Sequence, residues 1–229
     1  MKLLTFTILF FISLCTYGQI KVGKKLSKKF ENLSSKLDAK IYDALFLDST
    51  TRTEEGIGIA LFTKFKIDTL NLKDFNSDLL NEVKILNSDT GLEDVVVDEK
   101  LPFPYPDFIN AKLINNKLTI IIGFFNPNII YTIEDSKVES YYEEYFKDDN
   151  ILQLKLNQLK LSRLKIPMKT NKLVLSNKEF KIGDTLFGTV EFETKPYYIH
   201  ERNYGFKYNY IHQKVKGSLM FKVPISNMQ

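Results

Sequence analysis

The sequence is poor in the residues that carry thiol and metal chemistry. Its 229 residues include one cysteine, two histidines and no tryptophan. A single cysteine forms no intrachain disulfide and cannot supply a thiolate zinc or iron–sulfur site. The fold must therefore rest on an ordinary hydrophobic core, for which 18 Phe and 12 Tyr provide enough apolar surface.

Recognisable motifs for phosphate binding or catalysis are missing as well. The sequence has no GxxxxGKS or GxxxxGKT loop, no GxGxxG turn, no GxSxG elbow and no HExxH helix. The two imidazoles, His200 and His212, can form a metal site with Glu201, but their spacing fits polar positions of an exposed hairpin better. We therefore expect no catalytic residue, no metal and no cofactor.

The first 18 residues have the order of a bacterial-type secretory signal. Lys2 gives a positive start, residues 3–14 form an apolar stretch, and the small residues Thr16 and Gly18 stand at the −3 and −1 positions of a cleavage site. The stretch is shorter than the ~20 apolar residues of a spanning helix. We predict a signal peptide over residues 1–18, cleavage after Gly18 and an exported protein, either periplasmic or extracellular.

The single cysteine lies inside this leader and offers an alternative to it. A lipoprotein signal would place Cys15 at the first mature position, normally after a small residue, and the residue there is Leu14. Cleavage after Gly18 fits the pattern better. It would also remove the only thiol, so that no cysteine nucleophile remains in the mature chain.

Charge is distributed unevenly along the chain. The formal net charge is +4 at pH 7, yet residues 21–40 alone hold seven lysines against two acidic residues. The chain that follows residue 40 has a small excess of acidic side chains. Because the main body has no basic surplus, we expect no nucleic-acid partner.

The lysine-rich region has the pattern of an amphipathic helix. From Val22 to Leu45 apolar residues recur at intervals of three and four, and most lysines fall on the opposite face. This predicts a basic amphipathic helix over about residues 24–47, within an N-terminal region 19–48. The helix either packs across a sheet with its lysines in water, which we favour, or makes a peripheral membrane contact through residues 19–47.

Residues 49–229 form a β-rich domain in this interpretation, because the alternation of half-buried strands recurs through them. The pair Asn115 and Asn116 is typical of a tight hairpin turn. The strands predicted from alternation cover residues 57–62, 65–70, 120–125, 129–133, 152–161, 186–192 and 215–223.

Two further helices and one boundary are predicted within the β-rich domain. Ser136 and Glu139 match a capping box, which predicts a helix over residues 138–146. Asp74 is a candidate cap for a helix over residues 75–86. The alternating prolines of residues 101–107 predict irregular structure and a candidate subdomain boundary.

The predicted fold class is therefore α+β and mainly antiparallel β. We expect a sandwich or a curled sheet, an N-terminal amphipathic helix and one or two short helices. The preferred function is a non-catalytic envelope or secreted protein that binds a protein or small-molecule partner. A carrier of an apolar ligand is one alternative, because many Phe residues lie on the predicted strands.

The other alternative is a hydrolase of an envelope or extracellular polymer that uses a carboxylate pair. A glycosidase, for example, needs two carboxylates across a cleft. The candidate carboxylates are Glu143, Glu144, Asp148, Asp149, Glu191 and Glu193. We expect the first two to lie on the exposed face of the helix predicted over residues 138–146.

The candidate binding site is an aromatic surface between residues 196 and 213. Six aromatic residues are interleaved there with histidines and basic residues, more than one buried face of a hairpin accommodates. Tyrosine offers a rigid contact surface with a polar tip, which suits an interface. The alternative is that this face covers the core. The predicted binding residues are Tyr198, His200, Arg202, Tyr204, Phe206, Tyr208 and Tyr210.

Overall fold

The computed structural model describes most of the β-rich domain and part of the lysine-rich region. The described residues are 18–19, 21–37, 56–70, 104–123, 127–147, 149–156, 158–202 and 208–227. They contain one α-helix and twelve strands. Their bounds are β1 Gly18–Gln19, β2 Lys21–Val22, α1 Leu26–Ser34, β3 Ile57–Thr69, β4 Tyr105–Ile114, β5 Lys117–Ile122, β6 Asn128–Glu134, β7 Lys137–Tyr145, β8 Leu152–Gln153, β9 Arg163–Leu175, β10 Thr185–Thr194, β11 Tyr197–Arg202 and β12 Tyr208–Ser226.

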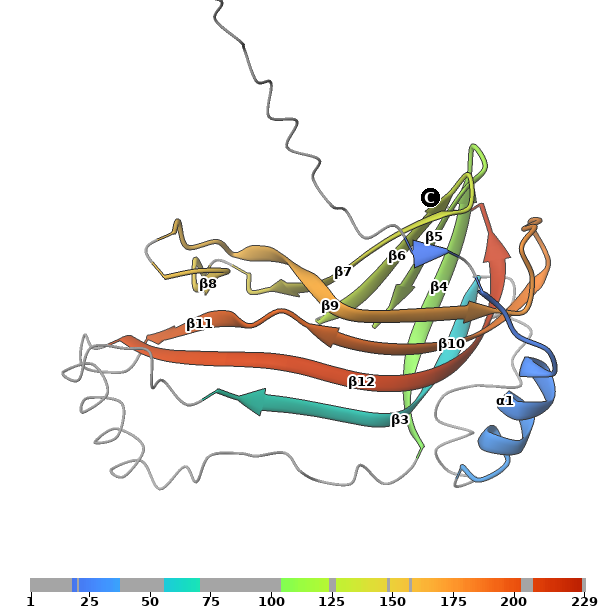
Figure 1. The fold of residues 1–229 in the computed structure, drawn as a ribbon, viewed down its shortest axis with the longest axis horizontal. Coiled ribbons are helices and arrows are strands. Elements are labelled where there is room, and N and C mark those ends of the chain that lie inside the picture. The colour runs from blue at the N-terminus through green and yellow to red at the C-terminus, as the bar shows by residue number, and fades with distance from the viewer. Residues whose placement is uncertain are drawn as a thin grey trace, which may run out of the picture.

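Eight of the strands form an antiparallel meander that closes on itself into a barrel (Figure 1). The order around the barrel is β3, β4, β5, β6, β7, β9, β10 and β12, and β12 closes it by pairing with β3. The expectation of mainly antiparallel β structure is confirmed, but the sheet is a closed barrel and not a sandwich. Closure depends on a pairing between the first and last strands of the meander, which the alternation within each strand does not specify.

The inside of the barrel is filled by side chains from alternate positions of its strands. On β5, for example, Leu118, Ile120 and Ile122 are fully or almost fully buried. Large rings also occupy the interior, with Tyr131 and Phe221 inaccessible to solvent. These residues belong to one continuous core cluster.

Helix α1 packs on the outside of the barrel wall (Figure 1). Phe30 contacts a second apolar cluster that includes Ile59 and Leu61 of β3. Its ring also meets Phe187 of β10 edge-on, with the centroids 6.0 Å apart. The apolar face of the helix is therefore covered by the barrel, as the favoured interpretation predicted. Among the described residues, no helix combines the length and the hydrophobicity that a membrane crossing requires.

The helix ends earlier than residue 47. It stops at Ser34, where two consecutive serine side chains donate to backbone carbonyls three residues before them. Such bonds compete with helix propagation, because they occupy the carbonyls that the next turn would use. The predicted length was therefore wrong, while the type was right.

The helix predicted over residues 138–146 does not form, because this segment is strand β7. Asp135 and Ser136 both have positive φ, 48° and 64°, and make the tight turn of the β6–β7 hairpin. The capping-box pattern was misleading, since the same two polar residues also suit a two-residue turn. The tyrosines of the segment favour a strand, in which residues 138, 140, 142 and 144 face inward.

Three smaller expectations also change. Residues 57–69 form the single strand β3, whose register to β12 shifts next to Ser218. Pro106 lies inside β4 near its start, where it pairs with Leu61. The strand expected over residues 152–161 is reduced to the short β8. The helix predicted over residues 75–86 lies outside the described residues.

The first two short strands bridge a seam in the barrel. Strands β7 and β9 pair only between Tyr141–Tyr145 and Arg163–Pro167. Beyond that point β1 pairs with the start of β7, and β2 pairs with the end of β9. The N-terminal segment thus pairs with those parts of β7 and β9 that do not pair with each other.

Candidate functional site

The hairpin of β11 and β12 brings the predicted binding residues together by register. Tyr198 lies opposite His212, His200 opposite Tyr210, and Arg202 opposite Tyr208. Only the backbone is described at Arg202, Tyr208 and Tyr210. Tyr204 and Phe206 lie outside the described residues.

Tyr198 and His212 form a stacked aromatic pair on this hairpin. Their ring centroids are 4.2 Å apart, and the two ring planes differ by 7°. Both side chains are half-buried, so each keeps part of its surface in contact with solvent. The sequence placed Tyr198 in the binding surface, but it did not identify His212 as its stacking partner.

His200 is part of the same hairpin but is buried. Its Nε2 lies 2.5 Å from Oε1 of Gln153 on β8, which pairs with β11. Burial, with a further contribution from the nearby Lys160 charge, lowers the pKa of His200 to about 4. The imidazole is therefore neutral at neutral pH and is covered by the β8 segment.

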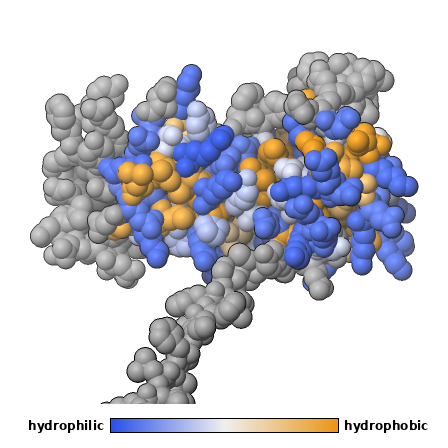
Figure 2. Space-filling view, turned by 90° about the horizontal axis from the view of Figure 1, so that it is seen from above, coloured by the Kyte–Doolittle hydropathy of each residue, from blue (hydrophilic) through white to orange (hydrophobic). Residues whose placement is uncertain are grey.

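Two exposed leucines lie in the segment that follows β8, and the strand register places Leu161 on the side of the sheet that carries Ile199 and not on the side of the stacked pair. Leu159 is 80% exposed and Leu161 is 37% exposed, in the segment between β8 and β9. Leu161 forms a bridge to Leu152, and Leu152 in turn pairs with Ile199 of β11. Figure 2 shows apolar patches among charged residues at both ends of one face.

The opposite face of the hairpin is anchored inside the barrel by hydrogen bonds. The Tyr197 hydroxyl donates to Glu144 Oε1 at 2.8 Å and accepts from Gln213 Nε2 at 2.7 Å. The Tyr142 hydroxyl also donates to Glu144 Oε1, at 3.0 Å. Burial raises the pKa of both Tyr142 and Tyr197 well above the usual range, and the neighbouring Glu144 carboxylate adds to this. Both tyrosines therefore stay protonated and act as donors.

This network was missed by the sequence analysis, which placed Glu143 and Glu144 on the exposed face of a helix. The structure buries both, leaving 7% and 6% of their surfaces exposed. In a strand, side chains two residues apart face the same way, so reading this segment as a strand would have placed Tyr142 and Glu144 together on the inward face. The match of Ser136 and Glu139 to a capping box favoured a helix instead, and the alternation was therefore not used.

A second polar layer crosses the interior between β6, β7 and β9. Tyr131 pairs with Ser140 across the β6–β7 ladder, and Asn171 Nδ2 donates to the Ser140 hydroxyl. The Tyr131 hydroxyl and Asn171 Oδ1 are buried without a hydrogen-bond partner among the described residues.

Four of the carboxylates of the hydrolase alternative, Glu143, Glu144, Glu191 and Glu193, have structural partners. Glu143 lies 3.7 Å from the Arg163 guanidinium. Glu191 and Glu193 stand on β10, and each pairs with a lysine at 2.9 Å, Lys172 and Lys214 respectively. Asp149 is exposed, and Asp148 lies outside the described residues. These ion pairs join neighbouring strands of the barrel wall.

Comparison with known proteins gives no guide to the function. No family model, no curated protein and no solved structure matches the chain. In the part of the chain that the structure describes, no three His, Cys, Asp or Glu side chains come together as metal ligands would. Function must therefore be argued from the geometry of the residues themselves.

Proposed function

We propose that this chain is an exported, non-catalytic protein that binds a protein partner at one end of its barrel. The binding region, which we name the hairpin surface, comprises the stacked side chains of Tyr198 and His212. The observation that carries the proposal is the Tyr198–His212 stack on a hairpin whose other face is anchored in the core.

Anchoring matters because a preformed surface binds at a lower entropic cost than one that must first be ordered. Tyr197 and Gln213 hold the inner face through hydrogen bonds, and both are buried. The outer face then presents a rigid aromatic pair that keeps part of its surface in solvent. Rigid aromatic side chains of this kind suit a protein interface.

The proposed export rests on the leader of residues 1–18 and on the expected cleavage after Gly18. Mass analysis of the N-terminus of secreted material tests this part separately. A chain that begins at Gln19 supports export through the signal. An intact Met1 or a lipid-modified Cys15 contradicts it.

Affinity capture with matched variants tests the proposed site. The double change Tyr198→Ser and His212→Ser should leave the melting temperature nearly unchanged and abolish capture of the partner that the wild type enriches. Tyr141→Ser is the control, because Tyr141 lies on the barrel wall against Lys165, 4.5 Å from the ring centroid to Nζ. The proposal is wrong if both variants lose the partner, or if neither does.

A further inference from the structure

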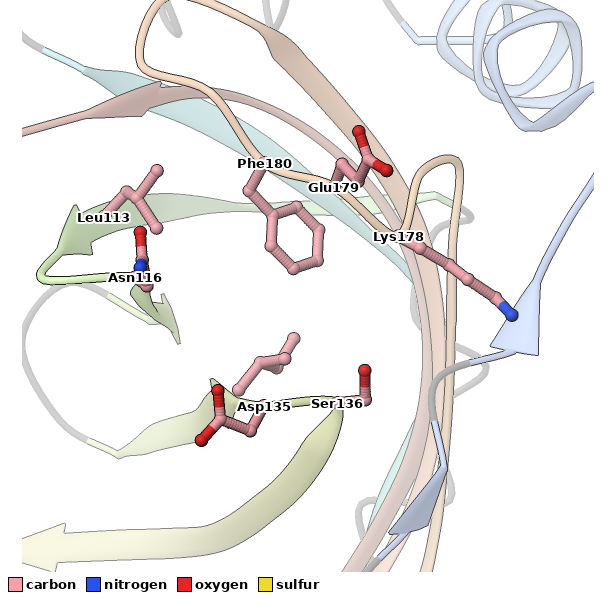
Figure 3. Close-up of a pocket in the computed structure, with 8 residues that line it drawn as sticks. Leu113, Asn116, Asp135, Ser136, Lys178, Glu179 and Phe180 are labelled. Carbon is pink, nitrogen blue, oxygen red and sulfur yellow. The ribbon is translucent and has the colours of Figure 1, made fainter.

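A cavity of about 290 Å³ (Figure 3) is lined by the β4–β5 and β6–β7 hairpins and the β9–β10 loop, at the end of the barrel opposite the β11–β12 hairpin (Figure 1). Strand β12 connects the two ends, since it begins in the hairpin and its Ile225 bonds to the loop between β9 and β10. Leu113 of β4, Ile133 of β6 and Phe180 of that loop supply the apolar lining. The volume is at the lower end of the range for small-molecule sites.

The walls of this cavity are held in place by tight turns and backbone hydrogen bonds. Asn116 and Asp135 lie in two-residue hairpin turns and have positive φ, 63° and 48°. The loop that carries Phe180 is fixed to β12 by two bonds of 2.8 Å, from Gly183 N to Ile225 O and from Ile225 N to Asp184 O. Phe180 itself packs against the core cluster. The cavity is therefore a preformed feature of this end of the barrel.

Polar groups at the rim favour a cationic ligand. Asp135 and Asn116 bring a carboxylate and a side-chain amide to the lining of the cavity, and Glu179 adds a second carboxylate to it. Lys178 also belongs to the lining, but Figure 3 shows its side chain extending away from the cavity. An acceptor-rich rim above an apolar floor matches a molecule with an ammonium group and an apolar body.

We propose that this cavity, the mouth site, binds a small amphipathic amine. The apolar body of the ligand packs between Leu113, Ile133 and the Phe180 ring, and its ammonium group donates to the Asp135 carboxylate. At about 30 Å³ for each water-sized unit, the cavity holds a ligand of roughly ten non-hydrogen atoms. The site is separate from the hairpin surface and does not depend on it.

Titration with three probes of matched shape tests the proposal. Phenethylamine carries a cation, phenethyl alcohol is neutral, and phenylacetate is an anion. We expect phenethylamine to bind at least about tenfold more tightly than phenylacetate, with the alcohol between them, because only the cation pairs with the rim carboxylate. In an NMR titration the largest shifts should occur at Leu113, Ile133 and Phe180.

Variants with matched controls separate the charge from the apolar floor. Asp135→Asn keeps the turn, since Asn tolerates positive φ, and should bring the affinity for the amine down to that for the alcohol. Glu134→Gln, in the same hairpin but outside the cavity, should change nothing. Phe180→Ala should weaken all three probes about tenfold through lost apolar contact. Ile182→Ala, at a 55% exposed position of the same loop, should not weaken them.

Several outcomes overturn the proposal. They are the absence of binding for all three probes, phenylacetate binding as tightly as the amine, and shifts centred away from the mouth site. An unchanged preference for the amine in Asp135→Asn also overturns it. The double variant Tyr198→Ser and His212→Ser should bind phenethylamine like the wild type, so the failure of one proposal does not imply failure of the other.

Discussion

Gly188 of β10 lies directly opposite Phe221 of β12, and the Phe221 ring fills the space that a side chain at Gly188 would occupy. A Cβ built at Gly188 would stand 2.2 Å from Cζ of that ring. The same two strands repeat the arrangement in reverse, with Phe192 of β10 opposite Gly217 of β12. Glycine on one strand thus makes room for an aromatic ring from its neighbour, which lets large side chains fill a narrow barrel.

The first prediction concerns this pairing. Gly188→Ala should destabilise the protein by ~2 kcal/mol or more, because Phe221 is fully buried and has little room to move. Adding Phe221→Leu to Gly188→Ala should recover part of the loss, so the double variant is more stable than the two single effects predict. Urea unfolding measures all three variants. Thr189→Ala is the control, and strictly additive effects would contradict the account.

The second prediction contrasts two buried tyrosines. Tyr131→Phe should raise stability by up to about 1 kcal/mol, because it removes a buried hydroxyl that has no partner among the described residues. Tyr197→Phe should lower stability by about 1–3 kcal/mol, because Glu144 and Gln213 each lose a hydrogen bond. Thermal or urea unfolding compares the two. Equal effects of both changes would show that these hydroxyls are equivalent, contrary to the structure.

Local structure could be predicted from the sequence where a few neighbouring residues determine the backbone conformation. The Asn115–Asn116 hairpin is confirmed, with both residues at positive φ, because asparagine tolerates that conformation. The Asp135–Ser136 turn was misread, because its residues suit a helix cap as well as a turn. Local patterns alone do not choose between the two, since the choice depends on whether β6 and a partner such as β9 are available for pairing.

The barrel and the candidate site depend on contacts between distant parts of the chain. Closure joins β3 to β12, and the stack joins Tyr198 to His212 only after the hairpin register is fixed. The sequence assigned the aromatic residues to one segment, and their role as a binding surface stays a prediction. It did not predict that His200 would be buried under Gln153, because β8 reaches β11 only in the folded chain.

The third prediction concerns pH. The pKa of His200 is about 4 in the folded protein, against ~6.5 for a histidine in an unfolded chain, so the unfolded chain takes up the proton first as pH falls. The stability that neutral His200 contributes is complete above about pH 6.5 and is lost progressively toward pH 4. Carboxylates titrate in part of this interval, so the measurement compares the wild type with His200→Gln.

In that comparison, the free energy of unfolding of the wild type should fall more steeply between about pH 6.5 and pH 4 than that of the variant. The His212→Gln variant serves as the control for loss of the other histidine. Parallel curves for the wild type and His200→Gln would mean that the imidazole titrates normally in the folded state. That result would contradict its burial beneath β8.

The fourth prediction concerns helix α1. Phe30→Ala should destabilise the protein by ~3 kcal/mol, because it removes a buried ring from the cluster with Ile59, Leu61 and Phe187. Lys29→Ala is the control, since Lys29 is exposed on the same helix, and it should change stability by less than about 0.5 kcal/mol. Chemical denaturation measures both. A similar small effect for the two variants would show that the helix is not docked on the barrel.

The central claim is that a partner binds at the hairpin surface, and hydrogen exchange of the complex tests it most directly. Exchange is measured for the protein alone and with the partner recovered by affinity capture. The account predicts slower exchange in β11 and in the start of β12, with little change in the hairpins of the mouth site. Slower exchange confined to the mouth site or to α1, or no change at the hairpin, would contradict it.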